Sequence, residues 1–316
     1  SAPSMRSSRP KRVVRSANAA LVARGRFDWA LAGGSTPAAL YRLLASPGHA
    51  ERVDWSRVHF YWSDERCVPP SHPDSNYRMA REALLDAIAV PAANIHRIPA
   101  ELPAPIAAER YERELEGVFQ VARGQGFPEF DLILLGMGAD GHTASLFPAS
   151  PALGELQRWV VANEVAALGA TRLTFTLPLL NAAQSVVFLV AGTDKAGRLE
   201  QVLSNASPPL PAQLVRPRGS EPEWFVDAEA GARLGLPIVV STKYFAEHQG
   251  MPYQPPEMGG SYSYDSFLRK DKPFPFQWHA WNLGTHRLFA WGDPDHARRF
   301  ALSCHLGDGV GYEVTP

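Results

Sequence analysis

The stretch Gly-Met-Gly-Ala-Asp-Gly-His-Thr-Ala-Ser-Leu-Phe-Pro occupies residues 136–148 and directly follows the apolar run Phe-Asp-Leu-Ile-Leu-Leu at residues 130–135. A short apolar run that ends in glycines is typical of a buried parallel strand. Glycine adopts backbone conformations with positive φ that other residues resist, so the chain can turn sharply after the strand. Open α/β sheets bind their ligands at the carboxyl ends of such strands. The stretch therefore predicts a parallel strand followed by a ligand-binding loop.

This loop carries side chains that could do chemistry. They are one acid (Asp140), one imidazole (His142) and two hydroxyls (Thr143 and Ser145). Histidine titrates near neutral pH and can therefore act as a base in the cell. Asp140 could orient the imidazole ring or stabilise its charged form. A glycine loop with a surface histidine would contain the same residues, so this stretch alone leaves both interpretations open.

The composition is that of an ordinary globular protein. The 316 residues suffice for one large domain or two smaller ones, and 45% of them are hydrophobic. A net charge of −1 gives no global field that would favour nucleic acid or an acidic membrane surface. With only Cys67 and Cys304, the sequence excludes a disulfide framework and a cysteine-built zinc site. This cysteine usage suits a reducing cytosol, so we expect a cytoplasmic protein. No apolar run approaches the roughly 18 residues of a membrane span.

The amino-terminal segment is basic, with no acidic residue before Asp28. Organellar transit peptides have a similar composition, but we interpret residues 1–16 as a disordered basic terminus. A secretory signal is not expected, because no apolar core follows the basic residues.

Outward from the central loop, runs typical of strands alternate with runs typical of helices. The expected strands cover residues 27–32, 58–62, 95–98, 130–135, 159–163, 172–178, 186–191 and 224–226. The expected helices cover residues 17–24, 38–44, 75–87, 104–123, 179–183, 193–203 and 227–234. This alternation predicts an α/β fold, in which a doubly wound, mostly parallel sheet has helices on both faces.

One expected strand ends in a glycine turn. The segment Gly33-Gly34-Ser35-Thr36-Pro37 leads from this strand into a helix. Free backbone N–H groups and the helix dipole at such a turn attract anions, phosphate above all. A plain helix cap would use the same residue types, so the turn alone does not decide between them.

Three cationic residues lie at the ends of other expected strands. Arg66 could bind phosphate or carboxylate bidentately, or it could pair with its neighbours Asp64 and Glu65. Lys195 falls in the first turn of a helix, where its charge is unfavourable to the helix dipole. It is either a residue that binds an anion or an ordinary surface lysine. Arg172 begins another strand. Residues that converge from several strand ends are what a small-molecule site requires.

Together these segments resemble the 6-phosphogluconolactonase family between residues 17 and 234. The matching segments cover residues 33–37, 63–69, 75–77, 136–148, 172–178 and 192–195. The related glucosamine-6-phosphate deaminases share the fold, the phosphate turn and an Asp-Gly-His sequence. They do not usually continue with Thr-Ala-Ser-Leu-Phe-Pro, which favours the lactonases.

The resemblance implies hydrolysis of 6-phospho-D-glucono-1,5-lactone in the pentose phosphate pathway, without a metal or a cofactor. His142 would be the general base that activates water, and Asp140 would support it. The residues implied in holding the 6-phosphate and the polar sugar edge are Gly33, Gly34, Ser35, Thr36, Arg66, Arg172 and Lys195. Which of the three cations contacts the phosphate stays open. The expected partner is the small-molecule lactone, with no nucleic acid or membrane, and a monomer is favoured.

Two alternatives stay open. One is an enzyme like the glucosamine-6-phosphate deaminases or isomerases, and the other is a non-catalytic protein that binds sugar phosphates or carbohydrate. Residues 235–316 lie beyond the resemblance, and 14 of these 82 residues are Phe, Trp or Tyr. Clustered aromatic residues suit sugar binding, but they equally suit a partial segment that packs on the enzyme or is disordered. We expect a C-terminal extension of unassigned fold.

Overall fold

The structure is a computed structural model that describes residues 3–204, 206–234, 287–288 and 313–314. The chain divides into two units, Ser1–Gly235 and Leu236–Pro316. Within the second unit, β10 (Arg287–Leu288) pairs in parallel with β11 (Glu313–Val314). Our other expectations for residues 235–316 lie outside the described residues.

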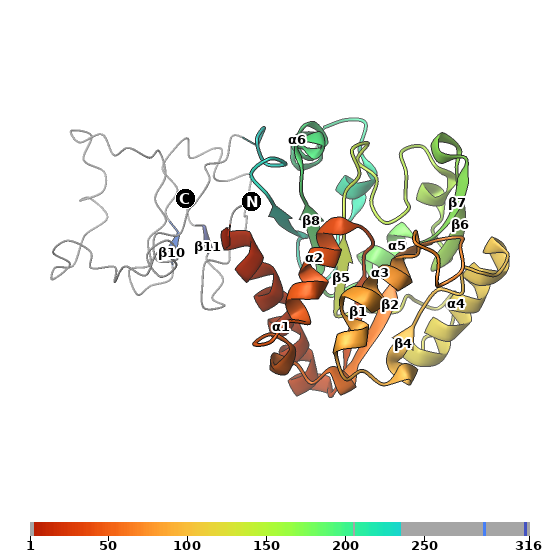
Figure 1. Cartoon of the computed structure of the whole chain (residues 1–316). Coiled ribbons are helices and arrows are strands. Elements are labelled where there is room, and N and C mark those ends of the chain that lie inside the picture. Colours follow the sequence, from red (N-terminus) through yellow and green to blue (C-terminus); the bar gives the residue numbers. More distant parts are fainter. Residues whose placement is uncertain (1–2, 205, 235–286, 289–312, 315–316) are drawn as a thin grey trace, which may run out of the picture. The chain divides into compact units, whose positions relative to one another are not determined.

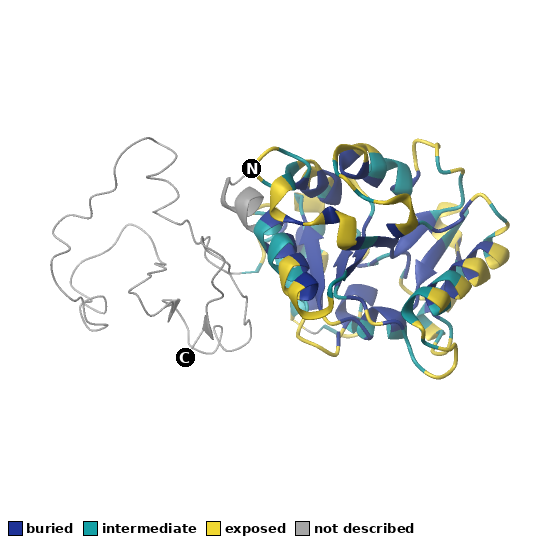
Figure 2. Ribbon diagram, turned by 90° about the horizontal axis from the view of Figure 1, so that it is seen from below, coloured by how far each residue is buried: buried dark blue, intermediate teal, exposed yellow. Residues whose placement is uncertain are grey.

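The first unit is built on a six-stranded parallel sheet (Figure 1). Its strand order is β4-β2-β1-β5-β8-β9, and every neighbouring pair is parallel. The strands are β1 (Phe27–Leu31), β2 (Val58–Trp62), β4 (Ile95–His96), β5 (Leu132–Leu135), β8 (Val186–Val190) and β9 (Glu223–Val226). Every residue of β1, β5 and β8 is buried, as apolar runs in a sheet covered on both faces must be. Helices lie on both faces (Figure 2), so the predicted fold class is confirmed.

A second, antiparallel sheet of three strands stands beside the first. Its order is β3-β7-β6, formed by β3 (Asp64–Arg66), β7 (Ala170–Phe175) and β6 (Val160–Val165). The amide of Phe175 donates to the carbonyl of Ser63 at 2.7 Å, which joins this sheet to the end of β2. Strands were expected near β6 and β7, the latter from its alternating residues, whereas the pairing of β7 with β3 was not expected.

Helix α1 (Pro3–Arg24) differs from the expectation of a disordered segment over residues 1–16, because residues 3–16 are helical. Its inner face is apolar, and Val13 and Ala17 are almost completely buried. The Arg12 guanidinium donates to the Glu223 carboxylate of β9 at 2.6 Å and to the Ser185 hydroxyl at 2.7 Å. Residues that looked like a basic tail thus anchor α1 to the edge of the parallel sheet.

The remaining helices follow the predicted order. They are α2 (Ser35–Leu44), α3 (Asn76–Ala83), α4 (Ala104–Phe119), α5 (Leu177–Asn181) and α6 (Ala196–Leu203). Helices α3, α4 and α6 are shorter than expected, α2 begins three residues earlier and α5 is shifted by two residues. As predicted, Ser75 caps α3, where its hydroxyl accepts a hydrogen bond from the Arg78 amide at 3.1 Å. The helix expected over residues 227–234 is wrong, because this segment forms only turns. The Asp227 carboxylate accepts from the amides of Ala230 and Gly192, and such local bonds compete with a helix.

Packing in the core fixes the turn after β1. Trp29 on β1 contacts Tyr41 of α2 edge-to-face, with ring centroids 5.9 Å apart. The Tyr41 hydroxyl donates to the carbonyl of Ala32 at 2.9 Å and accepts from its amide at 3.0 Å. Both polar groups of the first residue after β1 are therefore held by a buried side chain, and the amino end of α2 has a fixed position.

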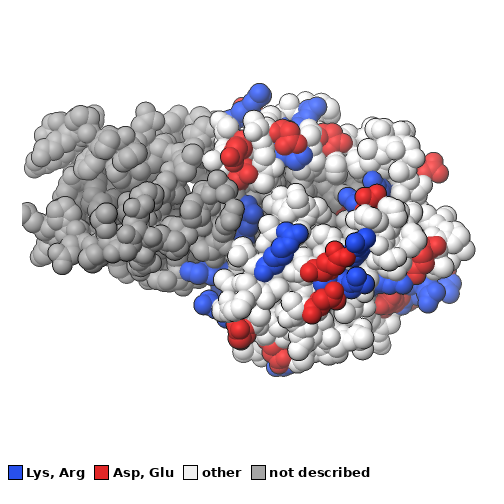
Figure 3. Space-filling view, in the orientation of Figure 1, with Lys and Arg blue, Asp and Glu red and all other residues white. Residues whose placement is uncertain are grey.

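The surface of the first unit carries mixed charge. On the face shown in Figure 3, basic and acidic side chains are interspersed and do not gather into a patch of one sign. None of the helices in the described part of the chain is long and apolar enough to cross a membrane. The expected cytoplasmic location, the monomeric state and the lack of a nucleic-acid partner stay predictions.

Candidate active site

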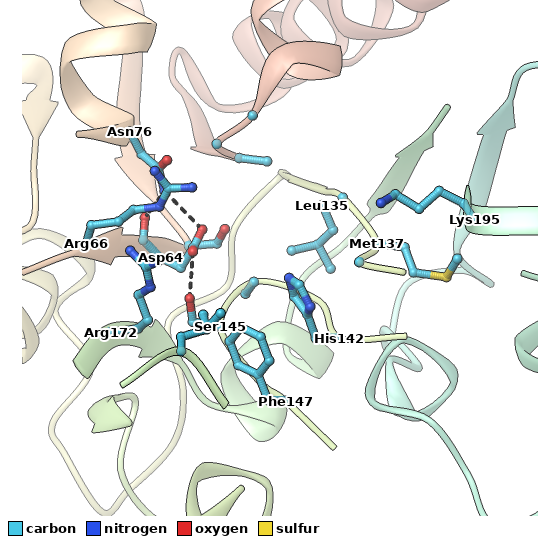
Figure 4. Close-up of a pocket in the computed structure, with 18 residues that line it drawn as sticks. Asp64, Arg66, Asn76, Leu135, Met137, His142, Ser145, Phe147, Arg172 and Lys195 are labelled. Carbon is cyan, nitrogen blue, oxygen red and sulfur yellow. Dashed lines mark hydrogen bonds between the residues drawn. The ribbon is translucent and has the colours of Figure 1, made fainter. Parts of the chain in front are cut away.

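A cavity of about 350 Å³ lies at the carboxyl ends of the parallel strands. Its lining comes from the turn after β1, from β3 and β7, from the loop after β5 and from the segment after β8 (Figure 4). Of the residues predicted from the sequence, Gly33, Gly34, Arg66, His142, Arg172 and Lys195 line it. Ser35, Thr36 and Asp140 do not. The expected convergence of strand ends is therefore present.

His142 and Asp140 form a close pair in the loop after β5. The Nδ1 atom of His142 lies 2.6 Å from Oδ1 of Asp140, and the same oxygen accepts from the His142 amide at 3.1 Å. With a proton on Nδ1 donated to Asp140, Nε2 is left as the basic ring nitrogen. The ring also stacks on Phe147, with centroids 4.1 Å apart and planes inclined by 27°. Two contacts thus hold the imidazole in one orientation.

Asp140 stays ionised beside this imidazole. Partial burial alone would raise the pKa of Asp140, but the hydrogen bond from the His142 amide and the attraction of the His142 ring outweigh it. The pKa of Asp140 is therefore below its usual value. A carboxylate that is charged at neutral pH can stabilise a protonated imidazole.

Gly138 leaves the space that this pair occupies. A Cβ atom at Gly138 would lie 2.1 Å from Nδ1 of His142 and 2.7 Å from Oδ1 of Asp140. The Gly138 amide also donates to the carbonyl of His142 at 2.9 Å, which closes the loop on itself. The glycine is needed here for close approach of the side chains.

The turn after β1 places the amino end of α2 at the cavity. Gly34 precedes the helix with φ at 100°, a conformation that favours glycine. A Cβ atom at Gly33 would lie 2.0 Å from Oδ1 of Asn76, so this position also requires glycine. Ser35 begins α2 with an exposed side chain. The turn contributes backbone N–H groups and a positive dipole end more than hydroxyl groups.

Arg66 and Arg172 lie opposite each other in the antiparallel register of β3 and β7. Arg66 donates to the backbone carbonyl of Asp74 at 2.6 Å. Burial, followed by the charge of Arg66, lowers the pKa of Arg172. Like charges directly opposite in a sheet destabilise it, and an anion between the two guanidinium groups would remove that cost.

The alternative pairing of Arg66 with Glu65 does not occur through the guanidinium. The Glu65 carboxylate accepts from the amides of Arg66, Asn76 and Tyr77 at 2.8, 2.7 and 2.8 Å, and from the hydroxyl of Ser75 at 3.1 Å. Glu65 thus holds the start of α3 against β3. In the described part of the chain, no ion pair involves Arg66 or Arg172.

Lys195 lies across the cavity from the two arginines (Figure 4). It ends the 3-10 turn Thr193–Lys195 that leads into α6. Its Nζ atom forms an ion pair with Asp194 at 2.6 Å, and its side chain is 22% exposed. The cavity is therefore cationic at two separate places, with His142 between them.

Sequence reasoning assigned Asp64 and Asn76 no role in the site, although Asp64 stood at a candidate strand end and both residues belong to segments that carried the resemblance. Asp64 accepts a hydrogen bond from the Ser145 hydroxyl at 2.8 Å, and Asn76 donates to the Asp64 carbonyl at 2.9 Å. The sequence shows polar residues after strands, but it does not show which of them turn inward. Among the residues that the structure describes, no group of three or more His, Cys, Asp or Glu could hold a metal ion. That the site works without a metal or cofactor stays a prediction.

The chain belongs to the glucosamine-6-phosphate isomerase/6-phosphogluconolactonase family, whose pattern matches residues 2–224. Within this family it is similar to proteins named 6-phosphogluconolactonase. That of Synechocystis sp. is 47% identical over 218 residues, which is 68% of this chain and 88% of the relative. That of Nostoc sp. is 44% identical over 220 residues, which is 69% of this chain and 88% of the relative.

The chain is also similar to a solved structure of a protein with this name. The crystal structure of 6-phosphogluconolactonase from Thermotoga maritima is 33% identical, with a TM-score of 0.60, and covers 69% of this chain and 92% of that one. The resemblance drawn from the sequence is thereby confirmed. The family match begins at residue 2, ahead of the residue 17 that we expected, and it ends before the C-terminal extension.

Proposed function

We propose that this protein hydrolyses 6-phospho-D-glucono-1,5-lactone to 6-phospho-D-gluconate in the pentose phosphate pathway. The observation that carries the proposal is the His142–Asp140 pair, which stands at a cavity lined by three cationic side chains. The relatives named 6-phosphogluconolactonase support this reaction over that of an amino-sugar-phosphate deaminase.

In the proposed mechanism His142 is the general base. Its Nε2 atom takes a proton from water while the water oxygen attacks the lactone carbonyl carbon, C1. The bond between C1 and the ring oxygen then breaks, and the ring oxygen takes the proton from the imidazolium to become the C5 hydroxyl. The new carboxylic acid releases its proton to solvent. Asp140 stabilises the imidazolium and, by binding Nδ1, leaves Nε2 on the opposite side of the ring from the carboxylate.

The phosphate and the polar edge of the sugar need positive charge. The backbone N–H groups of the turn Gly33–Thr36, together with Arg66, Arg172 and Lys195, provide it. Because the lactone also opens unaided in water, a modest rate enhancement suffices, and the proposed reaction needs neither metal nor cofactor.

The test is a lactonase assay with His142→Ala. The lactone is generated in situ from glucose 6-phosphate by its dehydrogenase, and 6-phosphogluconate formation is followed above the spontaneous rate. We expect the native chain to accelerate hydrolysis and His142→Ala to lose about 10²–10⁴-fold in kcat, the usual contribution of a positioned base. Binding of 6-phosphogluconate, measured by calorimetry, should be retained. His49→Ala, on the segment after α2, is the matched control.

Other outcomes favour the alternatives. Ammonia release from glucosamine 6-phosphate would favour the deaminase. Retained binding of sugar phosphates with no turnover by the folded native chain would favour a non-catalytic binding protein and overturn the lactonase.

A further inference from the structure

Asp64 is a buried carboxylate that faces the cavity. It begins β3 directly after the end of β2, lines the cavity and is only 9% exposed. Its Oδ2 atom accepts a hydrogen bond from the Ser145 hydroxyl at 2.8 Å. Its Oδ1 atom lies 3.4 Å from the Asn76 amide nitrogen, which donates a shorter bond to the Asp64 carbonyl. Figure 4 shows both contacts on the side of the cavity that holds the two arginines.

This carboxylate has acceptor capacity to spare. Two carboxylate oxygens can accept about four hydrogen bonds, and only the bond from Ser145 is short. Asp64 takes part in none of the ion pairs of the described residues, because Arg66 donates instead to the Asp74 carbonyl. Burial raises the pKa of Asp64, and the Ser145 hydroxyl, then Arg66, His142 and Arg172, oppose that rise. A buried acceptor without donors is costly, and a ligand that brings a donor would remove the cost.

The chemistry of a carboxylate narrows what this ligand group can be. In the ionised form, which Arg66, His142 and Arg172 favour against burial, the carboxylate only accepts hydrogen bonds, and it repels phosphate and a carbonyl oxygen. A neutral hydroxyl is the donor that it can bind. The lactone ring offers hydroxyls at C2, C3 and C4.

We propose that Asp64 is a specificity-determining residue that accepts a hydrogen bond from one ring hydroxyl of the lactone. This rests on the proposed function. Ser145 is then a positioning residue, because its hydroxyl holds Oδ2 and leaves Oδ1 for the substrate.

The same contact links recognition to catalysis. Ser145 belongs to the loop that carries His142, and the Asn163 side chain fixes this loop from behind by donating to the Ser145 carbonyl at 2.8 Å. Asp64 is therefore hydrogen-bonded to the same loop that carries the base, three residues along the chain from His142. A sugar ring oriented by Asp64 would have its carbonyl oriented with respect to His142.

The experiment compares native enzyme and Asp64→Asn on the parent lactone and on its 2-deoxy, 3-deoxy and 4-deoxy analogues. We expect Asp64→Asn to lose about 10–100-fold in kcat/KM on the parent, the range for a hydrogen bond to a charged group. For native enzyme, kcat/KM on one of the deoxy analogues should be lower than on the parent lactone by about the same factor. For Asp64→Asn, kcat/KM should be the same on that analogue as on the parent. The control Asp74→Asn removes an equal charge near Arg172 from a side chain that is 71% exposed and does not line the cavity.

Two results overturn the inference. The first is that native enzyme has the same kcat/KM on all three analogues as on the parent lactone. The second is that Asp64→Asn lowers kcat/KM by the same factor on the parent and on all three analogues, as a merely structural role would require. The measurements on native enzyme need no variant. If Asp64→Asn does not fold, Ser145→Ala replaces it, and we expect this variant to distinguish less between the parent lactone and the deoxy analogue. Failure of native enzyme on the parent lactone would instead overturn the proposed function.

Discussion

At the residue scale, the geometry of the His142–Asp140 pair depends on Gly138 having no side chain. A methyl group at Gly138 would fall 2.1 Å from Nδ1 of His142, far inside van der Waals contact. We therefore predict that Gly138→Ala displaces the ring from Asp140 and lowers kcat by about 10²–10³-fold, part of what a positioned base contributes. The fold should persist, because the strained atoms belong to a surface loop.

The lactonase assay together with far-UV circular dichroism checks this prediction. Gly154→Ala is the control, since a Cβ there meets no atom within 4 Å. Unchanged activity in a folded Gly138→Ala variant would show that the His142–Asp140 contact is dispensable.

The site residues differ in how well the sequence predicted them. His142 and Asp140 were found because they stand in a glycine loop directly after an apolar strand, where ligands bind. Asp64 stood at a candidate strand end, but the one role considered for it was that of a partner of Arg66, because a carboxylate beside an arginine suggests an ion pair. Its actual partner, Ser145, is 81 residues away. Contacts across that separation depend on the fold and leave no local pattern.

At the element scale, the parallel strands were predictable and the antiparallel sheet was not. Alternating residues in β7 indicate a strand with two different faces, but they do not indicate which strand it pairs with. The register that sets Arg66 opposite Arg172 therefore emerged only from the structure. Helix α1 was underestimated for a related reason, because its basic residues appeared solvated in the sequence, whereas Arg12 is buried against the carboxylate of Glu223.

Strands β2 and β4 also bring two histidines together at the β4 edge of the parallel sheet. Nδ1 of His59 lies 3.1 Å from Nε2 of His96, whose other ring nitrogen lies 2.8 Å from the Glu114 carboxylate. This contact needs one neutral ring, because two protonated rings would both be donors. Burial, and then the charge of Arg26, lowers the pKa of His59 to about 4, although Asp28 opposes the shift.

We predict that this pair makes the protein less stable in acid. An unfolded histidine takes up its proton near pH 6.5, whereas folded His59 does so near pH 4. Between these values the unfolded state binds more protons, so the free energy of unfolding falls as the pH falls from about 6.5 to 4. Urea denaturation at pH 7 and pH 5 measures the loss, and His59→Gln should make it smaller. The control is His72→Gln at an exposed histidine, which should lose as much stability between pH 7 and pH 5 as the native chain. If His59→Gln lost as much as the native chain, His59 would not be the cause of the acid sensitivity.

At the scale of the whole molecule, the predicted chemistry belongs to one of two units. Every residue of the cavity lies between Ala32 and Lys195, and the buried core of the described residues ends at Ala230. The first unit ends at Gly235, one residue beyond the end at Leu234 that the resemblance suggested. The family match ends at residue 224. The cavity therefore belongs to the first unit, and the assignment of residues 235–316 to a separate extension stays a prediction.

We therefore predict that a chain stopped at Leu234 folds and keeps the kcat/KM of the full chain on the lactone. The reason is that β9, the last strand of the parallel sheet, is already held by Arg12 of α1 and by its pairing with β8. Thermal unfolding and the lactonase assay, run on both chains at equal concentration, measure the two claims separately. A stable but inactive short chain would mean that the extension contributes to catalysis, and an unfolded one that it contributes to the fold. His142→Ala in the short chain should lose the same factor as in the full chain, which ties any retained activity to this site.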